Sequence, residues 1–398
     1  MGRCCGVPQY KGSPVRPPPR AMAAAALLLG VLSLLLLSLL SRLSRRGDGR
    51  GPRWGALHLL HPQGALHLSR LARRHGPMLR LRAAGREVLV PSSVATIREA
   101  LVRHWGDWLG RPHSYLGSLV SQGGRDLALG DPCPGWRRQR GAVRGALARA
   151  GGRLGPLLWL QGQELCEELR SYGEAPLDPF EVFTFHTCST IARLLFGELA
   201  LPNPGLRKLL QLVQHRDMFV ETQIQRHQLQ ARLRAELQGA QGPPGPGDVG
   251  RLPLLQATIS ETLRLRPPAP LALPHCALRH TSLGGLPVAA GTVLIPNLLA
   301  AQQDPDIWQH PEVFLPERFL APGAPSRSLL PFGCGARSCP GEGLARAELF
   351  VFLGLILREF RLEPGPEGLP GLRGSPGTVL RCPSFRLRMV PCQPPGLP

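Results

Sequence analysis

The stretch that decides the fold is FGCGARSCPG, residues 332–341. Cys339 follows a glycine-rich turn and precedes GEGLARAELFVFLGLIL, a run typical of a helix. A cysteine before a helix lies near unpaired backbone N–H groups and the positive end of the helix dipole. Such surroundings favour the thiolate form, which is the form that binds metals. The pattern therefore predicts that Cys339 is a metal ligand.

Four further positions of this stretch suit a flat cofactor that carries a carboxylate. Gly335 and Gly341 lack a β-carbon, so the backbone can pass close to such a cofactor at these points. Arg337 can form a charge-assisted pair with its carboxylate. Phe332 opens the stretch. Together with Cys339 these residues make five positions that define the motif. We expect all four to contribute to cofactor binding.

Two other interpretations of the cysteine are weaker. An isolated cysteine is most often a small buried hydrophobe, and Cys334 and Cys339 lack the paired spacing that a structural zinc site needs. The five fixed positions instead resemble the haem-binding loop of the cytochromes P450, haem-thiolate monooxygenases in which cysteine sulfur is the axial iron ligand. The resemblance implies heme b as cofactor and Cys339 as the catalytic axial ligand. It also implies a mainly α fold with a minor β region.

A second motif, E-T-L-R, holds Glu261 and Arg264 three residues apart on one predicted helix face. Alone this pair is weak evidence, because such pairs are usually solvated. Its context adds weight, since DPDIWQHPEVFLPERF at 304–319 is similar to a family pattern. The resemblance implies that Arg318 joins the pair, and that the three residues have a structural role in holding the cysteine loop.

Cations are expected along the edge of the haem, where its propionates lie. Trp136 and Arg140 form the W-x-x-x-R of a family helix, and Arg111 and His275 occupy matching family positions. With Arg337, the resemblance assigns these residues to cofactor binding. The neighbouring Arg137 and Arg138 are interpreted as solvated.

Several stretches are most similar to the steroid 21-hydroxylase branch of the family, among them LRLRPPAPLALPH, VLIPNLLAA and RPHSYLGSLVS. This implies hydroxylation of progesterone-type steroids at carbon 21, with electrons from NADPH through a flavoprotein reductase. The steroid is assigned to Gln225, Arg226 and Ala269, although glutamine stands where the family has a ketone-binding arginine. Another steroid-hydroxylating P450 and a non-catalytic haem-binding form are the alternatives.

Two segments of the family pattern are missing. Between FGELA, residues 196–200, and LPNPGLRK the family has a helix and loop that roof the substrate. Between QRHQLQ and ARLRAELQG it has the long central helix, with the acid and alcohol that relay protons to dioxygen. We therefore expect the P450 fold without its central helix and part of its roof, and a form impaired in turnover.

Composition bounds the class of partner. The 398 residues carry a formal charge of +20, almost all from arginine, yet no DNA- or RNA-binding module is present. A basic face for an acidic redox partner or an anionic membrane is the better interpretation. Ten cysteines without a disulfide framework fit a reducing compartment.

The chain divides into four expected parts: a basic extension at 1–20, a membrane anchor at 21–41, a basic hinge at 42–55 and a haem domain at 56–398. The uncharged anchor spans about 30 Å as a helix, one hydrocarbon core. A signal peptide is the rival, but arginines rather than a cleavage site follow the run. The basic flank favours a cytosolic domain, and the resemblance implies the endoplasmic reticulum membrane.

Within the haem domain helix dominates. A hairpin is predicted at 78–91 around Ala84 and Gly85, and helices at 67–77, 92–104, 136–150, 163–173, 183–197 and 254–267. One helical stretch is predicted at 201–239, strands at 281–297, and a loop with a hairpin at 363–391.

Overall fold

The computed structural model describes residues 54–55, 58–61, 63–83, 85–196, 227–240, 242–368, 379–380 and 382–392. The expected extension and anchor, the junction at 200/201, Gln225 and Arg226 lie outside these residues. Among the described residues no helix is long and apolar enough to cross a membrane.

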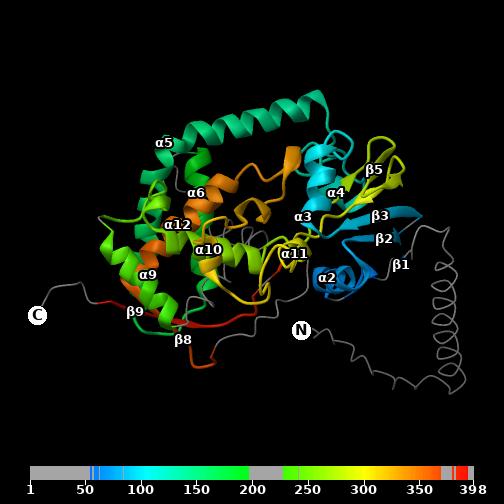
Figure 1. Ribbon diagram of the computed structural model, residues 1–398. Helices are drawn as coiled ribbons and strands as arrows, with labels where there is room; N and C mark the ends of the chain where they lie inside the picture. The colour runs from blue at the N-terminus through cyan, green and yellow to red at the C-terminus, as the bar shows by residue number, and fades with distance from the viewer. Residues whose placement is uncertain are drawn as a thin grey trace, which may run out of the picture. The chain divides into compact units, whose positions relative to one another are not determined.

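The helices of the domain from residue 56 onward are drawn in Figure 1. The α-helices are α2 (Gly64–His75), α3 (Val94–Arg98), α4 (Tyr115–Val120), α5 (Pro134–Ser171), α6 (Pro179–Phe196), α9 (His227–Gly239), α10 (Pro253–Leu265), α11 (Leu298–Ala301) and α12 (Glu342–Glu359). A π-helix, η2 (Glu99–Arg103), continues α3. Short 3-10 turns are η3 (Asp248–Gly250), η4 (Pro316–Phe319), η5 (Ser326–Ser328) and η6 (Gly335–Arg337).

The strands form small sheets. They are β1 (Trp54–Gly55), β2 (Met78–Ala83), β3 (Arg86–Pro91), β4 (His275–Cys276), β5 (Thr281–Leu283), β6 (Leu286–Val288), β7 (Val293–Leu294), β8 (Phe360–Pro364) and β9 (Leu387–Pro391). In one sheet the order is β2-β3-β7-β4, with β3 and β7 parallel. The predicted hairpin is β2–β3, in register from Met78 opposite Pro91 to Ala83 opposite Arg86. The β5–β6 and β8–β9 pairs stand apart from it.

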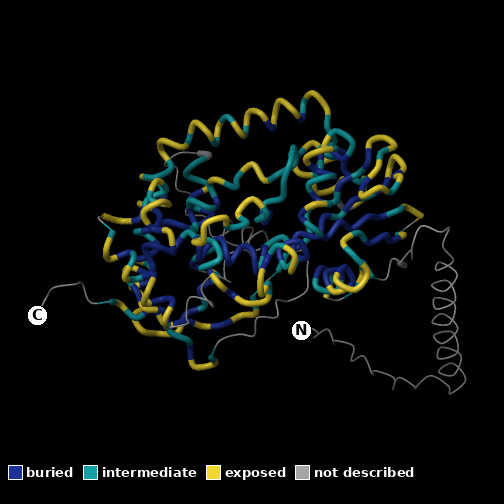
Figure 2. The backbone as a smooth tube through the Cα atoms, viewed as in Figure 1, coloured by how far each residue is buried: buried dark blue, intermediate teal, exposed yellow. Residues whose placement is uncertain are grey.

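Two hydrophobic clusters form the core. One joins α5, α9, α10, α12 and the β8–β9 pair, with Leu165, Leu233 and Phe350 fully buried. The other lies where β3 and β7 meet α3, η2 and α11, around Ile97, Leu294 and Ala301. Figure 2 shows both as dark stretches of the tube. The cysteine loop, residues 332–341, joins the two clusters in sequence, because Leu330 belongs to one and α12 to the other.

The prediction of separate helices at 136–150 and 163–173 is wrong. One helix of 38 residues, α5, continues through Gly151, Gly152 and Pro156. Glycines and a proline normally interrupt a helix. Here the second half of α5 packs against α6 and α12, so tertiary contacts outweigh the local preference. The first half of α5 is largely exposed (Figure 2).

The same substitution at two glycines of α5 should have opposite effects. A β-carbon on Gly162 would lie 2.4 Å from Cδ1 of buried Leu355, whereas one on exposed Gly152 would meet nothing within 4 Å. Gly162→Ala should lower the free energy of unfolding by about 1–3 kcal/mol through overpacking. Gly152→Ala should raise it by up to about 1 kcal/mol through helix propensity. Denaturant unfolding of the two variants checks this, and stabilisation by both would contradict the packing of α5 on α12.

Candidate functional site

Cys339 lies at the surface end of a short hydrogen-bonded loop. Its backbone N–H donates to the carbonyl of Phe332 at 3.0 Å, and that of Ser338 donates to Gly335 at 3.1 Å. The side chain is exposed, and Gly341, two residues on, is the N-cap of α12. The loop therefore places Cys339, an exposed residue, just ahead of the helix.

Cys334 has the opposite environment. It is partly buried and packs against the cluster around Leu101 and Leu330. Burial raises the pKa of the Cys334 thiol to about 11, despite the nearby charge of Arg98. Cys334 is therefore a neutral thiol inside the protein, and Cys339 is the cysteine of this loop that is open to a ligand.

The two glycines of the loop have different surroundings. Gly335 has a φ of +74°, and a β-carbon there would lie 1.8 Å from the Leu101 carbonyl oxygen of η2. The protein itself thus requires glycine at this position, and the expected close approach to a cofactor stays a prediction. A β-carbon on Gly341 would meet the Cys339 sulfur at an ordinary 3.9 Å.

Arg337 ties the loop to two other segments. Its guanidinium lies 3.9 Å from the centre of the Trp136 ring, and it donates to the carbonyls of Leu109 at 2.8 Å and Gly130 at 2.7 Å. Trp136, at the start of α5, is held in place because its indole N–H donates a hydrogen bond to the carbonyl of Leu127. Stacking and hydrogen bonds together leave Arg337 little rotational freedom.

The other three predicted cations reach the same region. Arg140 donates to the carbonyl of Ser338, the neighbour of Cys339. Arg111 donates to the carbonyls of Leu273 and Pro274 at 3.0 and 2.7 Å, just before His275. The Nδ1 of His275 lies 2.8 Å from the carbonyl of Trp108.

The charges of the three arginines repel one another, and they disfavour protonation of His275. Burial and then the charges of Arg337 and Arg140 lower the pKa of Arg111 to about 9. Burial and then Arg140 lower that of Arg337 to about 10, so both guanidinium groups stay charged at neutral pH. Burial and then Arg111 lower the pKa of His275 to about 3, which keeps its ring neutral.

This arrangement fits a haem. Three guanidinium groups cluster here, and in the part of the chain that the structure describes the buried Nε of Arg140 and Nε1 of Trp108 have no hydrogen-bond partner. Carboxylates placed here would offset the repulsion and accept such N–H groups. Among the described residues no group of three or more His, Cys, Asp or Glu could hold a metal ion.

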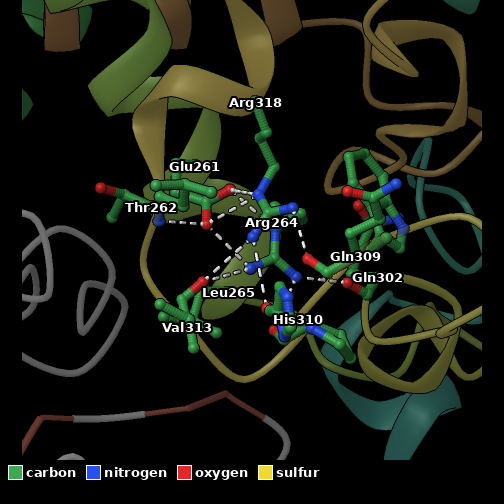
Figure 3. A network of polar contacts seen from close by, with 12 residues as sticks. Glu261, Thr262, Arg264, Leu265, Gln302, Gln309, His310, Val313 and Arg318 are labelled. Atoms are coloured by element: carbon green, nitrogen blue, oxygen red, sulfur yellow. Dashed lines mark hydrogen bonds and ion pairs between the residues drawn. The ribbon is translucent and has the colours of Figure 1, made fainter.

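Glu261, Arg264 and Arg318 lie together in a buried network (Figure 3). Arg264 donates to both oxygens of Glu261, at 2.7 and 2.9 Å, and Arg318 Nε lies 3.1 Å from Oε1. Glu261 and Arg264 are completely buried. The remaining N–H groups of Arg264 donate to the carbonyls of Gln302, Pro311 and Val313. The network joins α10 to the segment that leads toward the cysteine loop.

Only one of the three predicted substrate residues lies within the part of the chain that the structure describes. Ala269 is partly buried in the turn after α10, and its proposed companions Gln225 and Arg226 lie outside the described residues. Sequence reasoning also missed the carbonyls of Leu101, Leu109 and Trp108 as partners. A backbone carbonyl carries no sequence signal, so only the fold reveals such contacts.

Comparisons with known proteins agree with this geometry. The family model described as Cytochrome P450 matches residues 46–229 and 222–387. Steroid 21-hydroxylase of Felis catus is 35% identical over 85% of this chain and 91% of the relative. The Homo sapiens protein of the same name is 33% identical over 85% and 90%. The expected resemblance to this branch is confirmed.

A solved structure of similar fold supports the same assignment. A zebra fish cytochrome P450, solved with progesterone, has a TM-score of 0.76 and 28% identity over 82% of this chain and 99% of that one. The expected fold class, mainly α with a minor β region, is therefore confirmed.

The comparisons also bear on chain length. The alignment with the Canis lupus steroid 21-hydroxylase has 480 positions and spans 92% of the 398 residues, about 366, so more than a hundred positions face gaps in this chain. The two family matches meet at 222–229, next to the predicted loss of the central helix. With its loop, its triad and these relatives, the chain belongs to the cytochrome P450 family of monooxygenases.

Proposed function

We propose that this protein is a steroid-binding haem-thiolate P450 in which Cys339 is the axial iron ligand. The observation that carries the proposal is that Arg140 donates to the carbonyl of Ser338 beside Cys339, and that Arg111, Arg140 and Arg337 lie close enough for their charges to interact. When bound, the haem supplies activation of dioxygen. The protein supplies the thiolate and the anchoring of the cofactor.

Each residue of the site has a proposed role. Arg111, Arg140, His275 and Arg337 hold the two propionates. Trp136 orients Arg337 by stacking, and Phe332 and Gly341 flank the sulfur in the loop. Glu261, Arg264 and Arg318 contribute geometry and not chemistry, because their buried network joins α10 to the segment before the loop.

The steroid class, with carbon 21 as the position hydroxylated, is proposed from the names of the curated relatives. The progesterone bound by the zebra fish P450 is consistent with it. Electrons would come from NADPH through a flavoprotein reductase. The site of action would be the endoplasmic reticulum membrane, with residues 21–41 as the anchor, and the basic composition suits both partners.

A haem-binding form without efficient turnover is the second candidate, and α9 favours it. This helix runs without a break through 230/231, where the family pattern is expected to have its central helix. Leu229, Leu233 and Leu237 are buried at helical spacing on both sides of this junction. Gln230 bonds the N–H and the carbonyl of Leu362 in β8. The junction is thus compatible with a folded haem domain, although the proton-relay segment is missing.

Thiolate ligation is tested by replacing each of the two cysteines of the loop with alanine. Reduced protein with carbon monoxide should show the red-shifted Soret band of a thiolate-ligated haem. Cys339→Ala should abolish this band, and Cys334→Ala should retain it because its thiol is buried as a neutral group. Equal behaviour of the two variants would refute the ligand assignment.

Propionate binding is tested on one helix, α5. Arg140 is buried beside the loop, whereas Arg138 is exposed. A charge-assisted contact contributes about 1.5–3 kcal/mol. Arg140→Ala should therefore accelerate haem transfer to apomyoglobin by roughly ten- to a hundredfold, and Arg138→Ala should not change it. Equal rates of haem loss would count against the assignment.

Catalytic competence is tested with progesterone, NADPH and reductase added to membranes that carry this chain. Loss of an acid–base group lowers a rate by about 10²- to 10⁴-fold, so carbon 21 hydroxylation should fall at least that far. The control is a chain with both missing segments restored. Turnover comparable to that control would contradict the impairment.

A further inference from the structure

The π-helix η2 packs against the 3-10 turn η6 of the cysteine loop. Single π turns are rare and occur often at functional sites. In η2 the N–H of His104 donates to the carbonyl of Glu99, five residues back, at 2.9 Å. Leu101 lies in the last turn of this helix, where carbonyls lack an intrahelical N–H donor. Its carbonyl is therefore free to face outward.

That carbonyl faces the first residue of the turn before Cys339. The space where residue 335 would carry a β-carbon is filled by the Leu101 oxygen, 1.8 Å from the ideal β-carbon position, with the carbonyl carbon at 2.8 Å. Leu101 is 4% exposed, and the flanking Ala100 is fully buried. The carbonyl therefore has little room to withdraw from Gly335.

The contact leads to Cys339 through two hydrogen bonds. Gly335 opens the 3-10 turn η6 and accepts the N–H of Ser338, and Cys339 then donates to Phe332. A second link lies at the start of η2, where Arg98, the last residue of α3, donates to the carbonyl of Arg327. A displacement at Gly335 would therefore shift the backbone that carries the sulfur.

We propose that the π turn 99–103 is a positioning element for the iron ligand: its Leu101 carbonyl, seated on Gly335, sets the placement of Cys339. The inference rests on the proposed role of Cys339 as axial ligand. It assigns to η2 a role in ligand geometry that is separate from binding the propionates.

A matched pair of loop glycines tests the contact. Gly333 and Gly335 have nearly equal φ values, +73° and +74°, but a β-carbon on Gly333 would meet nothing within 4 Å. Alanine at either position carries the same backbone strain. Gly335→Ala alone should also displace the Leu101 carbonyl.

The measurements are amide hydrogen exchange at His104 and Cys339 in the haem-free full chain, and the thiolate-ligated fraction of the ferrous carbon monoxide complex. In Gly335→Ala, the amide hydrogens of His104 and Cys339 should exchange at least tenfold faster than in Gly333→Ala. The Gly335→Ala protein should also lose thiolate ligation. Equal exchange in the two variants, or no change at His104, would overturn the proposal. The exchange result does not depend on haem, so failure of the ligand assignment is recognised separately.

A second pair of variants approaches from η2, in case Gly335→Ala does not fold. Val102 is 43% exposed in the π turn. Glycine at position 102 makes the backbone of the π turn more flexible than alanine does. The amide hydrogen of Cys339 should therefore exchange about fivefold faster in Val102→Gly than in Val102→Ala. The core variant Gly162→Ala controls for global destabilisation and should leave the thiolate-ligated fraction of folded protein unchanged. An unchanged Cys339 amide in Val102→Gly would contradict the positioning role.

Discussion

The rest of the domain depends on the two ion pairs that Glu261 forms with Arg264 and Arg318. The Glu261 side chain is completely buried between these two arginines. Buried charges destabilise a protein unless they are paired and fully hydrogen-bonded. Here Arg264 uses its donors on Glu261 and on three carbonyls of the segment 302–313. A carboxylate oxygen also accepts the N–H of Leu315. The network thereby fixes irregular backbone, which has no sheet or helix to hold it, against α10.

The cations at the loop are balanced differently. Arg111, Arg140 and Arg337 have backbone carbonyls as partners. The carboxylates of Asp126 and Asp131 have smaller effects on the pKa values of Arg111 and Arg337 than burial and the neighbouring arginines have. A dianionic cofactor edge would relieve this repulsion. Anything that binds the folded state stabilises it by mass action. Haem should therefore contribute to the stability of this domain as well as to its chemistry.

Local sequence patterns predicted much of this arrangement, and long-range contacts explain what they missed. The β2–β3 hairpin and the E-T-L-R helix follow from alternation and helical spacing within a few residues. The decapeptide identified Cys339 because five positions had to agree at once. In contrast, α5 continues through Pro156 because of α6 and α12, which follow later in the chain. The partner of Gly335 was likewise hidden, because it is a backbone oxygen more than two hundred residues away.

Our central claim is that the buried triad of Glu261, Arg264 and Arg318 holds the segment before the cysteine loop in place, even though the central helix is missing. The most direct test is the free energy of unfolding of haem-loaded Glu261→Gln, measured beside Glu312→Gln, an exposed glutamate of the same network region. Removing the charge leaves two buried guanidinium groups without their counterion, which should cost about 3–5 kcal/mol. Glu312→Gln should stay within about 0.5 kcal/mol of the parent. A similarly small effect of both substitutions would contradict the claim.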